Sequence, residues 1–148
     1  MKKIVVMLVL AVFTLVAASS AYAVKCPQPR KTKAAPGAIW KNDKTAKADK
    51  ASGKKIYHET AKPMACKMCH GEKGAGDGNF GKALIPGPQN FTCKATMKKV
   101  SAGQMFWIIK NGSKGTGMLP YKKTEKKTGL KDQQIWDVIK YIREDLMK

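Results

Sequence analysis

The sequence is poor in acidic residues and in side chains that bind metal ions. Its 148 residues hold 10 Asp and Glu against 29 Lys and Arg, and they include only four Cys and two His. A structural zinc site needs four such ligands, usually in two pairs, and Cys66 and Cys69 form the one closely spaced Cys pair. A phosphate loop is disfavoured too, because the Gly-rich run 71–78 follows no predicted strand and lacks a closing Gly-Lys-Ser/Thr. A zinc ribbon and a nucleotide-binding loop are therefore both disfavoured.

Long apolar runs are missing except near the N-terminus. There, two lysines precede an apolar run over residues 4–18, and residues 21–23 (Ala-Tyr-Ala) have the small-x-small form of a cleavage site. The run is too short to span a bilayer comfortably. Residues 1–23 are therefore predicted to be a secretory signal peptide, with the mature protein in a bacterial periplasm. A lipid anchor at Cys26 is disfavoured, because the charged Lys25 precedes it.

Residues 24–50 are rich in Lys and Pro and poor in large apolar side chains. Such a segment buries too little apolar surface to fold alone. We therefore expect an extended basic arm, with Trp40 packing against the domain that follows. Cys26 and Cys93 are the two cysteines outside the close pair, and in an oxidising compartment they favour a disulfide that ties this arm to the domain. Two free thiols are the alternative.

The stretch Cys66-Lys67-Met68-Cys69-His70 has the spacing used for covalent attachment of a c-type haem. Two residues between the thiols, on one helical turn, set the sulfurs about one vinyl-to-vinyl distance apart, and the next side chain can reach the iron. A thioredoxin-like dithiol is the rival interpretation, but it should follow a strand in an α/β pattern. We therefore predict one covalent haem c held by Cys66 and Cys69, with His70 as the proximal iron ligand.

A haem site of this kind also needs a hydrogen-bond acceptor for the proximal His and a distal iron ligand. A ligating His donates its other ring N–H to a carbonyl or carboxylate, and the proline-stiffened stretch after the Gly-rich run offers the carbonyls of Pro86 and Pro88. A loop that merely covers the haem is the alternative for these two residues. For the distal iron ligand we predict Met118, which lies on a Gly-rich loop able to approach the haem. The other Met residues of the mature chain are alternatives. His58 is another, although its place on the helix leading into the motif indicates a surface residue.

Three helices are predicted around the motif, over residues 51–60, 101–111 and 130–147. Gly53 and Tyr57 share a face of the first helix, and the apolar face of the last helix should cross it. Ser101 and Gln104 have the capping-box form at the start of the second helix. Trp107 on that helix is a candidate donor to a haem propionate, with simple packing as the alternative.

In this order the motifs resemble a single-haem class I cytochrome c over about residues 51–146. The resemblance rests on Gly53 with Tyr57, Cys66/Cys69/His70, Gly74-x-Gly76-Asp77-Gly78, Asn111-Gly112, Gly115-x-x-Met118-x-Pro120, and a last helix with Trp136 and Tyr141. It implies an all-α domain at 51–148 that wraps short helices and loops round one haem. It also implies His and Met axial ligands and transfer of single electrons without catalysis.

The charge bears on partners. The formal net charge is +19, and removal of the two lysines within residues 1–23 leaves +17. Several lysines lie close in sequence to the loops expected at the haem: Lys67, Lys73, Lys82, Lys110, Lys114, Lys122 and Lys123. We expect a protein that is monomeric when free, with redox partners that present acidic docking surfaces and association that weakens in salt. A merely solvated lysine surface explains the scatter equally well.

Other partners and functions stay open. The basic arm could also meet an anionic membrane surface, whereas nucleic acid is not expected for an exported protein. A haem subunit docked to a larger oxidoreductase is one alternative function. A haem enzyme or ligand sensor is another, if Met118 is labile.

Overall fold

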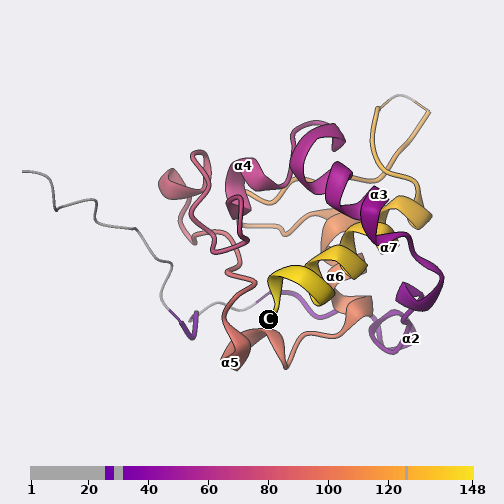
Figure 1. Cartoon of the computed structure of the whole chain (residues 1–148), viewed down its shortest axis with the longest axis horizontal. Coiled ribbons are helices and arrows are strands. Elements are labelled where there is room, and N and C mark those ends of the chain that lie inside the picture. Colours follow the sequence, from indigo (N-terminus) through magenta and orange to yellow (C-terminus); the bar gives the residue numbers. More distant parts are fainter. Residues whose placement is uncertain (1–25, 29–31, 126) are drawn as a thin grey trace, which may run out of the picture.

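The computed structural model describes residues 26–28, 32–125 and 127–148, and this part of the chain is helical (Figure 1). The elements are α2 (Gly37–Trp40), η1 (Thr45–Lys47), α3 (Lys50–Lys55), η2 (Ile56–Thr60), α4 (Lys67–His70), η3 (Gly81–Ala83), α5 (Lys94–Met97), α6 (Ala102–Asn111), α7 (Asp132–Tyr141) and η4 (Ile142–Leu146). Two isolated bridge pairs, and no strand, occur in these ranges. The all-α prediction is confirmed. The predicted signal peptide lies outside the described residues.

The first and last predicted helices cross, as expected. Asp49 caps α3 by accepting hydrogen bonds from the Ala51 and Ser52 backbone N–H groups, and the helix continues into the π-helical turn η2. At Gly53 the two backbones come so close that a Cβ would lie 2.0 Å from the Asp137 carbonyl oxygen. Only a residue without a side chain permits this approach. Figure 1 shows α3 lying across α7.

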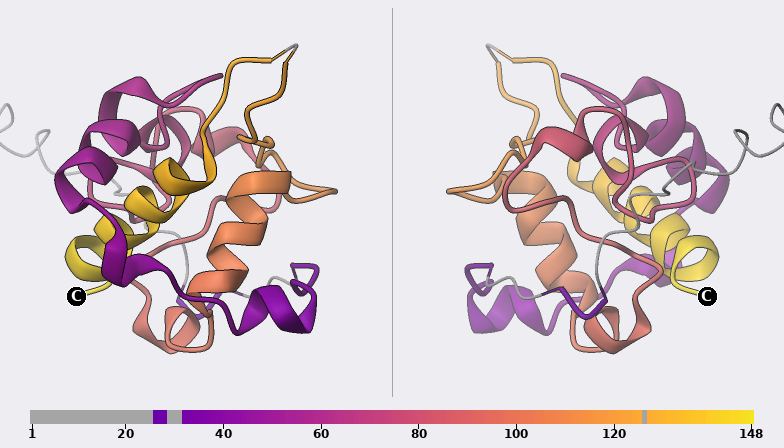
Figure 2. Two further views of the ribbon diagram at one scale, coloured as in Figure 1. Left: turned by 90° about the vertical axis from the view of Figure 1, so that its right-hand side faces the viewer. Right: turned by 90° about the vertical axis from the view of Figure 1, so that its left-hand side faces the viewer.

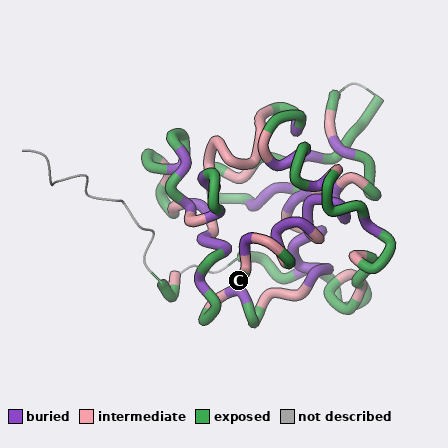
Figure 3. Tube along the Cα trace, viewed as in Figure 1, coloured by how far each residue is buried: buried purple, intermediate pink, exposed green. Residues whose placement is uncertain are grey.

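The third helix of the core, α6, begins and ends where the sequence predicts. The Ser101 hydroxyl accepts a hydrogen bond from the Gln104 backbone N–H at 3.0 Å, and Gly112 follows the last residue with a positive φ of 73°. Phe106 of α6 stacks on Trp136 of α7, with ring centroids 4.5 Å apart. Buried residues are concentrated along α6 and α7 (Figure 3). No described helix is long and apolar enough to span a bilayer.

The prediction of an extended arm is wrong for residues 32–50. They contain two short helices, α2 and η1, and α2 lies beside α6 (Figure 2). The capping box at α6 is only half formed, because the Gln104 side chain turns to this segment instead. Gln104 accepts from the Ala35 N–H at 2.6 Å and donates to the Lys33 carbonyl at 3.0 Å. These bonds to a buried amide hold a segment that has little apolar surface of its own.

Trp40 is not the main packing contact of this segment. Its side chain is 37% exposed, whereas Ile39 packs against the core and Ala35 is buried. The α2 backbone also approaches α6 so closely that a Cβ on Gly103 would meet the Ile39 carbonyl. Backbone proximity, more than an aromatic side chain, therefore decides where α2 sits.

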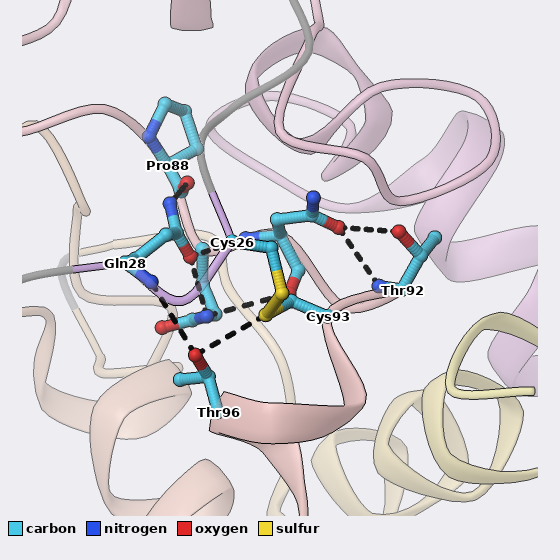
Figure 4. The surroundings of a disulfide bond; sticks show 8 residues. Cys26, Gln28, Pro88, Thr92, Cys93 and Thr96 are labelled. Atoms are coloured by element: carbon cyan, nitrogen blue, oxygen red, sulfur yellow. Dashed lines mark hydrogen bonds between the residues drawn. A yellow bond between two sulfur atoms is a disulfide. The ribbon is translucent and has the colours of Figure 1, made fainter.

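The predicted disulfide is present. Cys26 and Cys93 are joined with a Cα–Cα distance of 5.6 Å across 67 positions of sequence. The bond ties residues 26–28 to the segment between η3 and α5 (Figure 4).

Candidate haem site

The attachment motif forms α4, a single turn of helix that a loop folds over. The helix ends at Gly71, whose positive φ of 85° favours glycine. The Gly-rich run then returns along the helix, and its backbone N–H groups donate to carbonyls of α4. Gly76 donates to the His70 carbonyl at 2.8 Å, and Gly78 donates to the Cys69 carbonyl at 3.1 Å. The loop thereby stabilises a helix too short to be stable alone.

Two buried tyrosines fix the segments on either side of the motif. The Tyr57 hydroxyl donates to the Gly71 carbonyl at 2.8 Å, and the Tyr121 hydroxyl donates to the Met64 carbonyl at 2.8 Å. Burial, with a smaller contribution from the neighbouring Cys66, raises the pKa of both phenols well above the usual range. Both hydroxyls therefore stay protonated donors above about pH 10, where an exposed phenol ionises.

An apolar pocket opens beside α4. Its cavity volume is about 120 Å³. Cys66, Cys69, His70 and Met118 all line it. Much of the remaining lining is apolar: Met64, Ala65, Leu84, Pro88, Phe91, Met97, Val100, Met105, Ile108, Ile109, Leu119, Val138 and Ile142. The structure thus brings the predicted attachment and ligand residues to one cavity. Pro86 and Trp107 are not among the lining residues.

The His70 ring is held by a carbonyl and an aromatic ring. Its Nδ1 lies 3.0 Å from the Gln89 carbonyl oxygen, and the ring stacks on Phe91 at a centroid distance of 4.6 Å. A carbonyl can only accept, so Nδ1 carries the proton and Nε2 the lone pair that binds a metal. The predicted acceptors, Pro86 and Pro88, are wrong. The Pro88 carbonyl accepts from Gln28 instead, and the next carbonyl along the chain faces the ring.

Met118 enters the pocket from a hydrogen-bonded loop. The Met118 carbonyl accepts from the Ser113 N–H at 3.0 Å, and its own N–H donates to the Thr116 hydroxyl at 3.1 Å. The loop is therefore more constrained than its glycines indicate.

Other methionines also line the pocket. Met64 has its sulfur 4.0 Å from the Cys69 sulfur, beside the attachment motif. Met97 and Met105 belong to the buried core cluster. Met64 and Met118 are the lining methionines outside the buried core cluster, and Met118 is the one that comes from a segment distant in sequence from the motif.

The prediction that His58 is a surface residue is wrong. Its side chain is only 13% exposed, with Nδ1 3.0 Å from a Glu72 carboxylate oxygen and Nε2 2.9 Å from the Tyr141 hydroxyl. Glu72 also pairs with Lys67 of the motif at 3.2 Å. His58 does not line the apolar pocket, so it serves the packing between η2 and α7 and is not placed as an iron ligand.

The thiols differ from those of a redox dithiol. Burial raises the pKa of Cys66 to about 12, and burial also raises the pKa of Cys69. Reactive Cys-x-x-Cys sites show the reverse, a lowered thiol pKa. In the described part of the chain, no cluster of three or more His, Cys, Asp or Glu is placed to bind a metal. These observations argue against the thioredoxin-like and zinc alternatives.

The residues of the pocket fit a covalent haem c. Two thiols lie on one helical turn, an imidazole carries its proton on Nδ1, and a thioether and an apolar lining complete the site. This fold and this donor set define a helical cytochrome. The chain belongs to the cytochrome c family as a class I c-type cytochrome, since the family model described as cytochrome c matches residues 50–144. Membership implies a covalently bound c-type haem and a role in electron transfer. Neither the curated proteins nor the solved structures gave a match.

The lysines near the pocket differ in their pairing. Lys67 pairs with Glu72, and Lys110 pairs with Asp132 at 2.8 Å while lying 5.0 Å above the Phe106 ring. The others have exposed side chains, and no ion pair among the described residues involves them: Lys73, Lys82, Lys114, Lys122 and Lys123. They leave positive charge available to a partner.

Proposed function

We propose that this chain is an exported, periplasmic single-electron carrier with one haem c, attached through Cys66 and Cys69 and ligated by His70 and Met118. The observation that carries the proposal is the shared pocket: these side chains come from two separate segments and line one apolar cavity. On this hypothesis residues 1–23 are the signal peptide, 24–50 a basic N-terminal segment and 51–148 the cytochrome domain.

When bound, the haem supplies one-electron chemistry, because its iron alternates between the ferrous and ferric states. The chain tunes that chemistry. A Met118 thioether ligand raises the reduction potential relative to a second His, and the apolar lining disfavours the additional charge of the ferric state. The bond from His70 Nδ1 to the Gln89 carbonyl acts in the other direction, since it makes the imidazole a stronger electron donor.

Electron transfer rather than catalysis follows from the ligand set. If His70 and Met118 both held the iron, no place would remain at it for a substrate. The protein therefore acts as a carrier, monomeric when free, that meets redox proteins with acidic docking surfaces through its unpaired lysines. The positive charge of the same lysines would also attract a larger complex with an acidic surface, or an anionic membrane surface.

Binding of carbon monoxide to the reduced holoprotein tests this function. A carrier with Met118 firmly ligated should show no carbon monoxide spectrum over minutes, whereas Met118→Ala should bind the gas at once. Met97→Leu is a matched control, since Met97 also lines the pocket but belongs to the core. Rapid binding to the unaltered protein would favour the enzyme or sensor and overturn the carrier.

A further inference from the structure

Gln28 holds the loop that carries the His70 acceptor. Its Nε2 donates to the Pro88 carbonyl at 2.7 Å, and its Oε1 accepts from the Asn90 N–H at 2.8 Å and from the Gln89 side-chain amide at 2.5 Å. One side chain thereby bonds the residues on both sides of the peptide that faces His70. Figure 4 shows Gln28 beside Pro88 and the disulfide.

The bond to Asn90 matters most, because the Asn90 N–H and the Gln89 C=O belong to the same peptide group. The hydrogen bonds run in series: the His70 Nδ1–H donates to the Gln89 oxygen, and the Asn90 N–H of that peptide donates to Gln28 Oε1. Hydrogen bonds in such a chain polarise and strengthen one another. Gln28 therefore both aims the Gln89 carbonyl and makes it a better acceptor.

The disulfide keeps Gln28 in place. Cys26 lies two residues before Gln28 and is bonded to Cys93, which follows the same loop. The Gln28 backbone N–H also lies 3.4 Å from the Thr96 hydroxyl. Gln28 and Cys26 both precede residue 50, where the match to the family begins. The elements shared with the family therefore do not supply this support.

We propose that Gln28, held by the Cys26–Cys93 disulfide, is a positioning residue for the proximal ligand and lowers the reduction potential of the haem. The proposal rests on the function above, in which His70 ligates the iron. Without Gln28 the Gln89 carbonyl is a weaker and less ordered acceptor. His70 then donates less electron density, and the ferric state loses stabilisation relative to the ferrous state.

The test compares holoprotein variants. Gln28→Met keeps the length of the side chain but removes both of its hydrogen-bonding groups, and Cys26→Ser with Cys93→Ser removes the disulfide. Gln133→Met is the matched control, because Gln133 bonds Lys47 and Asp137, which do not line the pocket. The readouts are the equilibrium reduction potential and the hydrogen exchange rate of the Asn90 amide.

Gln28→Met should raise the potential by up to about 59 mV, which for one electron is a tenfold change in the redox equilibrium. It should also speed Asn90 exchange at least tenfold, while Gln133→Met changes neither. The disulfide variant should shift both readouts in the same direction. Combining the two changes should give less than the sum of their effects, since both act through one loop.

The two proposals can fail separately. If Gln28→Met keeps the His/Met spectrum of the unaltered protein but leaves the potential unchanged, or lowers it, the positioning role is wrong and the carrier function stands. If the unaltered protein lacks a His/Met spectrum, the ligand assignment itself is wrong. Faster Asn90 exchange with no change in potential would show that Gln28 is only a structural support, which also overturns the proposal.

Discussion

Substitution of Gly53 by Ala probes the contact on which the fold depends. The new Cβ would lie 2.0 Å from the Asp137 carbonyl oxygen, where ordinary contacts begin at 3.4 Å. The Gly53 Cα and the Asp137 carbonyl both belong to helix backbones, which cannot shift locally. Helix α3 must therefore move away from α7 by about 1.4 Å, the difference between these two distances. That movement opens the core between the helices. It also stretches the bonds from the Asp137 carboxylate to the Asp49 N–H at 2.9 Å and the Ser52 hydroxyl at 3.1 Å.

The expected cost follows from these contacts. Overpacking costs about 1–3 kcal/mol, and each weakened hydrogen bond costs about 0.5–1.5 kcal/mol. The gain in helix propensity from Gly to Ala offsets about 1 kcal/mol. Gly53→Ala should therefore destabilise the holoprotein by about 1–5 kcal/mol, which for a domain of this size lowers Tm by at least about 4 °C.

Thermal and denaturant unfolding of the holoprotein measure this effect, and Gly37→Ala provides the control. Gly37 is the first residue of α2, and a Cβ there meets nothing within 4 Å. The same substitution at this site should be neutral or stabilise by up to about 1 kcal/mol. Equal stabilities for Gly53→Ala and the unaltered protein would refute the crossing of α3 and α7 at Gly53.

Two further predictions concern charge and pH. Electron transfer to an acidic redox protein should slow about tenfold or more as ionic strength rises from about 0.01 to 0.5 M. The double variant Lys122→Gln/Lys123→Gln should weaken this dependence of the rate on ionic strength more than the double variant Lys54→Gln/Lys55→Gln on α3, because Lys122 follows the pocket residue Tyr121. Equal dependence on ionic strength in the two double variants would contradict steering at the pocket. Burial raises the pKa of the Tyr57 and Tyr121 phenols. Above about pH 10 the unfolded chain loses these protons and the folded chain keeps them. The contribution of these two phenols to the free energy of unfolding should therefore be constant below that pH and fall as the pH rises above it. Urea unfolding between about pH 8 and 11 should show a shallower fall for Tyr121→Phe, and an unchanged slope would contradict the burial.

Periodicity and short motifs predict much of this molecule. Helix faces repeat at fixed spacing, so the crossing at Gly53 and the limits of α6 could be predicted and are confirmed. The Cys26–Cys93 pairing followed from counting the thiols left over, and it is present. The assignment of His70 and Met118 as ligands stays a prediction, although both line the predicted kind of pocket.

Several hydrogen bonds that the sequence did not predict are made by single glutamine side chains. The side chains of Gln28 and Gln104 hold the proximal loop and the N-terminal segment, yet glutamine has no characteristic spacing when it bonds to distant backbone. The prolines indicated the correct stretch for the His70 acceptor, but they do not show which carbonyl of that stretch faces the ring. The acceptor is the Gln89 carbonyl, not that of Pro86 or Pro88. His58 looked exposed because the residues that cover it, Glu72 and Tyr141, come from distant segments.

The ligand pair can be tested most directly through the weak near-infrared sulfur-to-iron band of the oxidised protein. That band requires a methionine sulfur on the ferric iron. Met118→Leu, which keeps the volume of the side chain, should abolish it, while Met64→Leu in the same pocket should leave it intact. A band that survives Met118→Leu and disappears in Met64→Leu would contradict the assignment of Met118, and with it the pairing of the attachment motif to the 113–118 loop.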